Sequence, residues 1–574
     1  MKNTFFTLIA FIVGLSLYGQ GKESLISEKV KENIRVRVDN GVHPSIVLGV
    51  IEDGAVEFYS YGVKSYETEE VVTPHTVYEI GSISKTFTGT ILAQMVLNGE
   101  LNIDDPAQSL LPKGVQAPTR NGEEIKLYQL SNHTSSLPRM PDNMDPEDPD
   151  NPYADYTEDQ LYTFLEGVEL KRDIGSEYEY SNFAVGLLGH LLAEKRGTTY
   201  EALLAKEITG PLDMNETRIE FTPEMKANLA TGYSEGFEVS NWDLSVFAGA
   251  GAIRSTASDL MKYLAANLGV EESELYPAMQ LTQENSGAED SDPMVGLGWH
   301  IVPLKKKVII AHGGATGGYS TFAAFIKEGS TGVVVLTNCT MGVEDIGLHI
   351  LEPKNDLENP KPSVAIEVRK TIDENGPDSA SEVFWSLKKN EPKKYSFGEV
   401  ELNSLGYSYL AKEEMENAMA VFRLNVRAFP KSWNAYDSYA EGFMMMDERD
   451  SSIVYYKKSL ELNPANTNGI QMLEKLGVSS EGLVNELILE EDILARYTGV
   501  YQLAPEFKIT ITQEGTRLWA QATGQSGFEL FARSESEFFL KAVDAQVMFN
   551  SNDKGEVESL TLFQGGREMI GMRE

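Results

Sequence analysis

Alternating hydrophobic and polar residues predict strands near both ends of the first 350 residues. Residues 45–51 and 56–62 flank the Asp53-Gly54 pair and predict a hairpin with a tight turn. A second strand-rich stretch covers residues 296–338, with glycines between its strands. Apolar residues at helical spacing fill the region between the two stretches. We therefore expect one sheet built from both ends of this region, with a helical insertion.

A 34-residue repeat indicates a different architecture at residues 391–478. Small residues let paired helices approach, an aromatic ring fills the space beside them, and a proline ends each unit. The pattern resembles tetratricopeptide repeats, which either bind peptides or act as structural spacers, and both functions stay open here. Residues 373–389 are a candidate for a divergent helical neighbour. The repeated positions are Gly406, Ala418, Phe422 and Pro430, then Ala440, Ser452, Tyr456 and Pro464.

The segments on either side of these repeats differ in pattern. Residues 352–390 are polar and proline-containing at their start and predict a linker with a helical segment. Residues 490–574 alternate as strands do, with predicted hairpins at 508–521 and 546–563. We expect a small antiparallel sheet or partial barrel there. The whole chain is thus predicted to be α+β, followed by α-helical repeats and a small all-β domain.

The first twenty residues have the pattern of a secretory signal peptide. Lys2 precedes a 14-residue apolar stretch, from Phe5 to Tyr18, and small or polar residues follow. A helix needs about 20 apolar residues to span a bilayer, so this stretch is short for a membrane span. We expect residues 1–20 to be removed and the protein to be exported, to the periplasm or the extracellular space. An uncleaved anchor is the alternative, and no stable membrane insertion of the mature chain is expected.

Composition narrows the classes of partner. Hydrophobic residues make up 41% and charged residues 24% of the 574 positions, which excludes wholesale disorder. Asp and Glu total 87 against 49 Lys and Arg, a net charge of −38. Such a surface repels phosphate backbones and anionic lipid, so nucleic acid is not an expected partner.

Neither a metal nor another cofactor is expected. Cys339 is the only cysteine, which excludes an internal disulfide and a thiolate cluster. The seven histidines include no His-x-x-x-His pair. The acidic segment 142–159 has residue types that suit calcium, but prolines at 146, 149 and 152 interrupt any regular ligand spacing, and a solvated loop is the better interpretation.

A Ser-x-x-Lys motif opens a predicted helix at Ser82. The apolar stripe of this helix runs from Phe87 to Val96, and Gly99 ends it. A spacing of three puts the Ser82 hydroxyl and the Lys85 amine on one face. Unpaired N–H groups at a helix start favour an oxyanion, and a buried lysine can lose its charge and accept the serine proton.

The motif alone is not specific, because Ser386 and Ser551 begin two further matches and Ser82 could simply cap a helix. Two later segments add to it. Tyr180-Ser181-Asn182 precedes an apolar helical run, and His312-Gly313-Gly314 follows a predicted strand. Each has a structural alternative: a core tyrosine with a capping asparagine, and a glycine turn after a satisfied histidine. Their order after the Ser-x-x-Lys motif makes all the structural alternatives together improbable.

With these three segments the chain resembles the penicillin-recognising serine hydrolases, which include class C β-lactamases, D,D-peptidases, D-aminopeptidases and related esterases. The resemblance covers residues 23–351 and implies a β-lactamase/D,D-peptidase-like fold, an antiparallel sheet with flanking helices. The C-terminal strands resemble, more loosely, a domain appended to such hydrolases. The matching segments are Glu79–Gly89, Leu130–Pro138, Pro211–Met214, Gly251–Asp259, Gly296–Trp299 and His312–Ser320.

The resemblance implies a role for each catalytic residue. Ser82 would be the nucleophile, Lys85 its activating partner, and Tyr180 the general base and later the proton donor to the leaving group. An unperturbed phenol has a pKa of about 10, so this role for Tyr180 requires cationic neighbours, Lys85 and His312, to lower its pKa.

The resemblance also implies a substrate-binding set. Asn182 would position the substrate amide, and the N–H groups of Ser82 and Ala315 would form the oxyanion hole beside His312 and Gly314. Many members of the family have lysine where His312 stands. An imidazole with an unperturbed pKa of about 6.5 is charged only about a quarter of the time at pH 7, so His312 is a poorer clamp for a substrate carboxylate.

These observations predict an exported serine hydrolase that acts through a Ser82 acyl-enzyme on a small-molecule or peptide substrate. Amide bonds of β-lactams or D-amino-acid peptides are the first expectation, and small carboxylic esters are the alternative. From another class, an inert hydrolase domain could serve as a scaffold while the repeats recruit a protein or peptide partner.

Overall fold

The computed structural model describes residues 24–287, 293–478, 489–504, 507–523, 527–540, 545–552, 555–564 and 567–574. The predicted signal peptide, residues 1–20, lies outside these residues. The chain forms two compact units. The first unit comprises the described residues up to Ser234 together with Glu238–Pro360, and the second comprises Glu235–Phe237 and the described residues from Lys361 onward.

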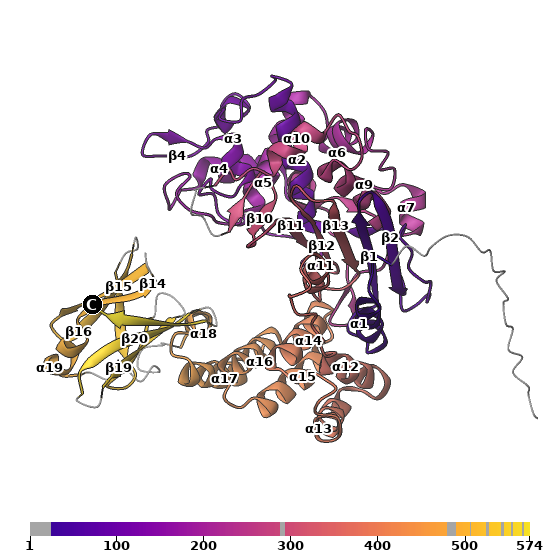
Figure 1. The fold of residues 1–574 in the computed structure, drawn as a ribbon. Helices are drawn as coiled ribbons and strands as arrows, with labels where there is room; N and C mark the ends of the chain where they lie inside the picture. Colours follow the sequence, from indigo (N-terminus) through magenta and orange to yellow (C-terminus); the bar gives the residue numbers. More distant parts are fainter. Residues whose placement is uncertain are drawn as a thin grey trace, which may run out of the picture. The chain divides into compact units, whose positions relative to one another are not determined.

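A seven-stranded antiparallel sheet is the centre of the first unit (Figure 1). The predicted Asp53-Gly54 hairpin is present as β1 and β2, and β1 pairs along its length with β13, from Ile46 opposite Thr337 to Glu52 opposite Thr331. The expectation of one sheet from both ends of this region is therefore confirmed. In sheet order the strands are β2 (Ala55–Gly62), β1 (Ser45–Glu52), β13 (Thr331–Thr337), β12 (Ser320–Ile326), β11 (Val308–Ala315), β10 (His300–Pro303) and β9 (Met294–Val295).

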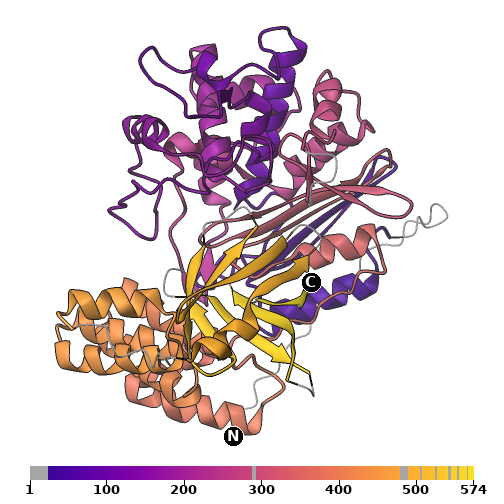
Figure 2. The ribbon, with the colours of Figure 1, turned by 90° about the vertical axis from the view of Figure 1, so that its left-hand side faces the viewer.

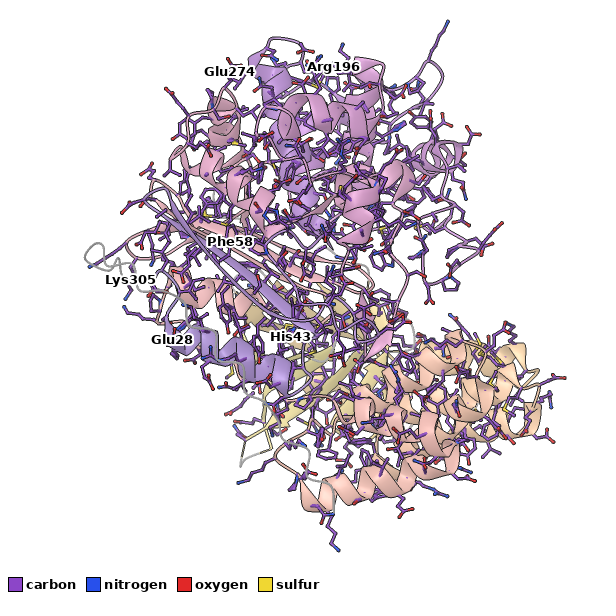
Figure 3. The ribbon with its side chains drawn as sticks, turned by 90° about the vertical axis from the view of Figure 1, so that its right-hand side faces the viewer. Glu28, His43, Phe58, Arg196, Glu274 and Lys305 are labelled. Carbon is purple, nitrogen blue, oxygen red and sulfur yellow. The ribbon has the colours of Figure 1, made fainter. Side chains whose placement is uncertain are left out.

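Helices cover both faces of this sheet (Figure 2). Ile46 and Leu48 of β1 pack with the helices α1 (Glu28–Asp39) and α11 (Glu344–Leu351), whereas Val47 packs into the helical side with α9 (Ala257–Leu268). Successive residues of a strand point to opposite faces, so β1 is apolar on both. Figure 3, seen from the side opposite to that of Figure 2, shows Glu28 at the start of α1 and Phe58 of β2 above that helix.

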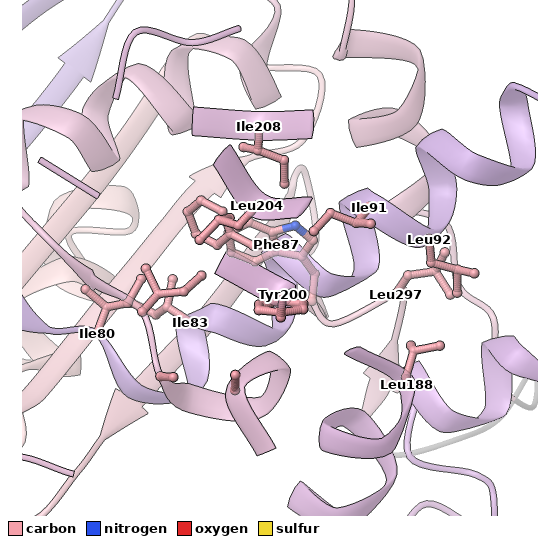
Figure 4. Packing of buried hydrophobic residues seen from close by; sticks show 14 of the residues in the cluster. Ile80, Ile83, Phe87, Ile91, Leu92, Leu188, Tyr200, Leu204, Ile208 and Leu297 are labelled. Atoms are coloured by element: carbon pink, nitrogen blue, oxygen red, sulfur yellow. The ribbon is translucent and has the colours of Figure 1, made fainter. Parts of the chain in front are cut away.

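The helical insertion packs around α2 (Ser84–Leu97) (Figure 4). The sequence predicts one apolar stripe on this helix, but α2 is buried almost all round. Thr88 and Thr90 are buried because their hydroxyls reach the hydroxyls of Tyr200 and Tyr263. The other helices here are α3 (Leu127–Ser131), α4 (Glu158–Gly167), α5 (Asn182–Arg196), α6 (Tyr200–Leu204), α7 (Pro223–Ala227), α8 (Ala248–Gly251) and α10 (Tyr276–Thr282).

The second unit begins with helices where the sequence predicts a linker. Residues 352–390 contain two helices, α12 (Val364–Asn375) and α13 (Ala380–Asn390), rather than a single helical segment. Their polar residues face outward, and α12 buries Val364 and Val368. The polar residues on which the linker prediction rested therefore belong to the outward-facing sides of amphipathic helices.

The 34-residue repeat corresponds to two successive helix pairs. Gly406 packs against Phe422 so closely that a Cβ on it would lie 2.3 Å from the ring, and Ala440 packs in one cluster with Tyr456. Assignment of these pairs to the tetratricopeptide family stays a prediction. The pairs are α14 (Glu399–Ala411) with α15 (Met415–Ala428), and α16 (Trp433–Met445) with α17 (Arg449–Leu462), and α18 (Thr467–Lys475) follows.

The C-terminal strands form a closed eight-stranded antiparallel barrel. Both predicted hairpins are present, as β15 with β16 and β19 with β20. The barrel is closed rather than partial because its first and last strands pair, with Tyr501 opposite Arg573. Its strands are β14 (Gly499–Ala504), β15 (Phe507–Glu514), β16 (Arg517–Ala522), β17 (Phe528–Ala532), β18 (Glu537–Leu540), β19 (Ala545–Ser551), β20 (Val557–Gln564) and β21 (Arg567–Arg573).

The described residues contain neither a membrane-spanning helix nor a cluster of metal-ligating side chains. None of their helices combines the length and the apolar character that crossing a membrane requires. No group of three or more His, Cys, Asp or Glu side chains among them is placed to hold a metal ion, and this includes the acidic segment 142–159.

Candidate active site

Two glycines bring strand β11 against the turn that carries Ser82. Gly81 and Ser82 belong to a short 3-10 turn that leads into α2. A Cβ on Gly81 would lie 2.7 Å from the backbone nitrogen of Ala315, and a Cβ on Gly314 would lie 2.0 Å from the carbonyl oxygen of Ile80. Only glycine permits this backbone-to-backbone contact. The end of β11 is thereby held beside Ser82.

Lys85 reaches back to Ser82 from the first turn of α2. Its Nζ lies 3.0 Å from Ser82 Oγ and donates to the carbonyl oxygen of Ala250 at 2.6 Å. The side chain is 0% exposed. Burial, with a smaller contribution from the charge of Arg139, holds the pKa of Lys85 well below its usual value. A neutral amine at this distance can accept the Ser82 proton. By contrast, Ser386 of a second Ser-x-x-Lys match is exposed on α13.

Tyr180 lies beside this pair, immediately before α5. Lys85 Nζ is 4.9 Å from the centre of the Tyr180 ring. Burial raises the pKa of Tyr180 to about 12, against the opposing effects of a hydrogen bond with Ser82 and the charge of Arg139. The expectation that Lys85 and His312 lower the pKa of Tyr180 is therefore wrong. The phenol stays protonated at neutral pH and is a proton donor rather than a base.

Asn182 is the first residue of α5, and its amide is not the helix cap. Ser181 takes that place, because its Oγ accepts from the backbone N–H of Ala184. The Asn182 amide makes no hydrogen bond to another described residue and lines a cavity of about 30 Å³ beside Ser82. The lining residues are Gly81, Ser82, Tyr153, Asn182, Trp242, Leu244, Phe247, Ala250, Gly251, Ala315 and Thr316.

His312 lies on β11 and is buried, with 3% exposure. Its Nδ1 donates to the carbonyl oxygen of Gly313 at 2.6 Å, which leaves Nε2 as a bare acceptor without a partner among the described residues. Burial first, then the neighbouring His300 and Lys85, hold the pKa of His312 well below 6.5. The sequence predicts that His312 carries a charge part of the time at pH 7, whereas in the structure it is neutral.

The structure adds three aromatic residues that motif analysis did not assign. The His133 ring is 4.4 Å from the Tyr180 ring, and its Nδ1 accepts from the backbone N–H of Ser181 at 3.1 Å. Tyr178 donates to His300 Nε2 at 3.1 Å, and the His300 and His312 rings are 5.0 Å apart. His133 stands in a segment that carries the family resemblance, but neither histidine has a sequence spacing that indicates its place.

Arg139 is a fourth residue that the sequence did not single out. Its guanidinium carbon lies 5.2 Å from the centre of the Tyr180 ring, and the side chain is exposed. The Arg139 carbonyl oxygen accepts from the backbone N–H of Asn182 at 3.0 Å and of Phe183 at 3.2 Å. The start of α5 thus fixes the backbone from which this arginine projects.

The acidic segment 142–159 contributes to the wall of the cavity. Tyr153 from this segment packs edge-on against Trp242, with ring centres 5.2 Å apart. Trp242 Nε1 donates to the carbonyl oxygen of Asp150 at 3.1 Å, and the backbone N–H of Asp243 donates to Asn151 Oδ1 at 2.8 Å. The predicted solvated loop therefore places one aromatic ring beside the candidate nucleophile.

Two family models match the chain. Residues 30–349 match the model described as beta-lactamase, and residues 486–572 match one described as a domain of unknown function (DUF3471). The first match covers the segments that hold Ser82, Lys85, Tyr180 and His312, and the second covers the C-terminal barrel.

Two relatives that are named for their enzyme activities match the same region. A beta-lactamase of Escherichia coli K12 is 26% identical over 368 residues, which span 58% of this chain and 94% of that protein. The D-alanyl-D-alanine-carboxypeptidase/endopeptidase AmpH of the same strain is 29% identical over 308 residues, 51% of this chain and 78% of that one. A crystal structure of a beta-lactamase/D-alanine carboxypeptidase from Pseudomonas syringae has a TM-score of 0.50 at 21% identity, covering 57% of this chain and 98% of that one, and shows a common fold.

Proposed function

The chain belongs to the beta-lactamase family of serine hydrolases, and on this premise we propose that Ser82 forms an acyl-enzyme with the amide carbonyl of β-lactams or D-amino-acid peptides. The observation that carries the proposal is the pairing at 3.0 Å of Ser82 Oγ with the buried amine of Lys85, whose pKa burial holds well below its usual value. The activities for which the relatives are named, beta-lactamase and D-alanyl-D-alanine-carboxypeptidase/endopeptidase, support this substrate class.

Acylation begins with proton transfer from Ser82 Oγ to Lys85 Nζ. The alkoxide attacks the substrate carbonyl, an Oγ–C bond forms, and the carbonyl oxygen becomes an oxyanion. The backbone N–H groups of Ser82 and Ala315 stabilise that charge, because β11 holds Ala315 against the turn of Ser82. The Asn182 amide, which has no hydrogen bond to another described residue, orients the substrate at the same cavity.

Tyr180 completes the first half-reaction. As the C–N bond breaks, the leaving nitrogen takes the phenolic proton, which is available because the pKa of Tyr180 is about 12. The protonated Lys85 then returns a proton to Tyr180. In the second half-reaction water attacks the acyl carbonyl and its proton passes to Lys85 Nζ. As the Oγ–C bond breaks, Lys85 passes that proton on to Ser82 Oγ, and the carboxylic acid product leaves.

Small carboxylic esters are the second candidate substrates. The neutral state of His312 favours them, because a neutral ring supplies no charge for a carboxylate. An ester leaving group also needs less help from a proton donor than an amine does. The same acyl-enzyme serves both substrate classes.

We propose in addition that the protein is exported and that the helical repeats bind a peptide or protein partner. The apolar stretch from Phe5 to Tyr18 after Lys2 supports export. Expression of the full gene in a bacterium tests this: the periplasmic or secreted product should lack about 20 N-terminal residues by intact mass, whereas a full-length, membrane-bound product would contradict it.

Intact-mass spectrometry with benzylpenicillin tests the acyl-enzyme. The purified protein should gain the mass of one penicilloyl group, and the Ser82→Ala variant should not. A persistent adduct indicates a peptidase that penicillin inhibits, and a short-lived one indicates a β-lactamase. If no adduct forms, hydrolysis of p-nitrophenyl acetate by the wild type but not by Ser82→Ala supports the esterase. Failure of both assays would indicate the inert scaffold.

A further inference from the structure

We propose that Arg139 binds a free carboxylate of the substrate and makes the cleft selective for acyl donors that carry one. The inference rests on the proposed function, because it assigns a substrate feature to the same cleft. Arg139 would supply the positive charge for a substrate carboxylate that a neutral His312 does not provide.

Hydrogen bonds to the start of α5 fix the position of the Arg139 backbone. Two N–H groups at the start of α5, those of Asn182 and Phe183, bond the Arg139 carbonyl oxygen. One residue earlier, Ser181 Oγ donates to the carbonyl oxygen of Pro138 at 2.6 Å. These bonds tie the backbone of Arg139 to the helix that carries Asn182, and the guanidinium lies 5.2 Å from the Tyr180 ring centre.

The guanidinium of Arg139 has no protein partner to neutralise it. It makes no ion pair or hydrogen bond with another described residue, although the chain has 87 acidic residues. The adjacent Arg172, in contrast, pairs with Glu179. No carboxylate of the described residues shifts the pKa of Lys85 or of Tyr180, whereas Arg139 affects both. Among the described residues, the Arg139 guanidinium is thus left without a counter-ion.

Arg139 also differs in chemistry from the histidines and the lysine at the site. Burial holds the pKa values of His133, His300 and His312 below their ordinary value, and that of Lys85 is lowered too. A guanidinium keeps its charge and offers a planar pair of donors that matches a carboxylate. A β-lactam and a peptide C-terminus share that group.

Binding to the Ser82→Ala variant tests the inference without any turnover. Isothermal titration would compare N-acetyl-D-alanyl-D-alanine with its C-terminal amide, and benzylpenicillin with its methyl ester. At least one acid should bind about 10- to 100-fold more tightly than its neutral partner, as a hydrogen bond to a charged group predicts. Which pair shows the preference tells a peptide carboxylate from a lactam carboxylate.

Two variants in the Ser82→Ala background locate the preference. Arg139→Gln should bring the acid-to-neutral ratio close to one, and Arg139→Lys should restore part of it, which a merely structural role of the stacked arginine would not do. Arg172→Gln is the matched control, and the preference should survive it. The preference should also be constant between pH 6 and pH 9, since a guanidinium does not titrate there.

Three results would overturn the inference: equal binding of acid and neutral ligand, no binding of either acid, or a preference that survives Arg139→Gln. A preference lost above pH 7 would instead assign the carboxylate to a histidine. The acyl-enzyme is tested separately on the wild type. An adduct that forms equally fast from benzylpenicillin and its methyl ester rejects only the role of Arg139, while an acid preference without any adduct rejects only the acyl-enzyme.

Discussion

Lys85 Nζ lies 3.0 Å from Ser82 Oγ on a side chain that solvent does not reach. The lysine is buried, and no carboxylate of the described residues contributes to the shift of its pKa. A buried, unpaired amine is unfavourable for folding, because the unfolded chain can protonate it in water. The geometry that activates the nucleophile therefore lowers the stability of the protein.

Lys85→Met should separate these two effects. Loss of the proton acceptor should slow acylation of Ser82 by about 10²–10⁴-fold. Removal of the buried amine should raise the free energy of unfolding by about 1–2 kcal/mol. Penicilloyl adduct formation measures the first effect and urea unfolding the second. The exposed Lys126 is the control, since Lys126→Met should change neither. A Lys85→Met protein with a lower free energy of unfolding than the wild type would contradict the conclusion that the buried amine is destabilising.

The pH dependence of acylation should follow Lys85 and not His312. The rate should rise as Lys85 loses its proton, at a pH well below 10.5, and then stay level, because Tyr180 ionises only near its pKa of about 12. Burial holds the pKa of His312 well below 6.5, so no step is expected near pH 6.5. The measurement is kcat/KM for a neutral ester from pH 5 to pH 10. A rate that falls between pH 8 and pH 10 would mean that a protonated Lys85 is required.

Stability should change with pH for the same reason. The pKa of Lys85 is lower in the folded protein than in the unfolded chain, so the unfolded chain binds the extra proton in the window between the two values. The contribution of Lys85 to stability thus rises with pH through that window. Unfolding free energies of the wild type and Lys85→Met should converge as the pH approaches 10.5.

Local patterns predicted much of this structure, and long-range packing accounts for the rest. The β1–β2 hairpin follows from alternation around Asp53-Gly54, and the Ser82–Lys85 spacing lies within one helical turn. The pKa of Tyr180, however, depends on burial by segments far away in the sequence. Arg139 carries no recognisable pattern, because an exposed arginine is ordinary until its neighbours in space are known.

Two neighbouring glycines on β11 offer a matched test of the oxyanion hole. A Cβ on Gly314 would lie 2.0 Å from the carbonyl oxygen of Ile80, whereas one on Gly313 would meet nothing closer than 3.4 Å. Gly314→Ala should push Ala315 away from Ser82 and reduce the acylation rate by about 10²–10³-fold, as loss of an oxyanion donor does. Gly313→Ala should acylate nearly as fast as the wild type. Equal rates for the two variants would contradict the role of Ala315.

A buried ion pair holds the backbone of Trp242 in the wall of the cleft. Glu79 and Arg254 are 2% and 3% exposed, with Arg254 Nη2 3.1 Å from Glu79 Oε1. Glu79 Oε1 accepts from the backbone N–H of Trp242 at 3.0 Å, and Arg254 donates to the Trp242 carbonyl oxygen at 2.6 Å. Glu79→Ala leaves the buried arginine charge with only the exposed Asp243 as a partner, 3.3 Å from Arg254 Nη2, so it should lower the free energy of unfolding by about 3–5 kcal/mol in urea unfolding.

Replacement of both Glu79 and Arg254 separates the effect of the ion pair on stability from its effect on the shape of the cleft. A Glu79→Leu/Arg254→Met double variant buries no charge and should recover most of the lost stability. It still lacks both hydrogen bonds to the Trp242 backbone, and Trp242 lines the cavity beside Ser82. The double variant should therefore stay slow in acylation although it is folded. Asp104→Ala, which breaks an exposed pair with Lys126, is the control and should leave stability nearly unchanged. A double variant with wild-type acylation would mean that the ion pair supports the fold alone and does not position the wall.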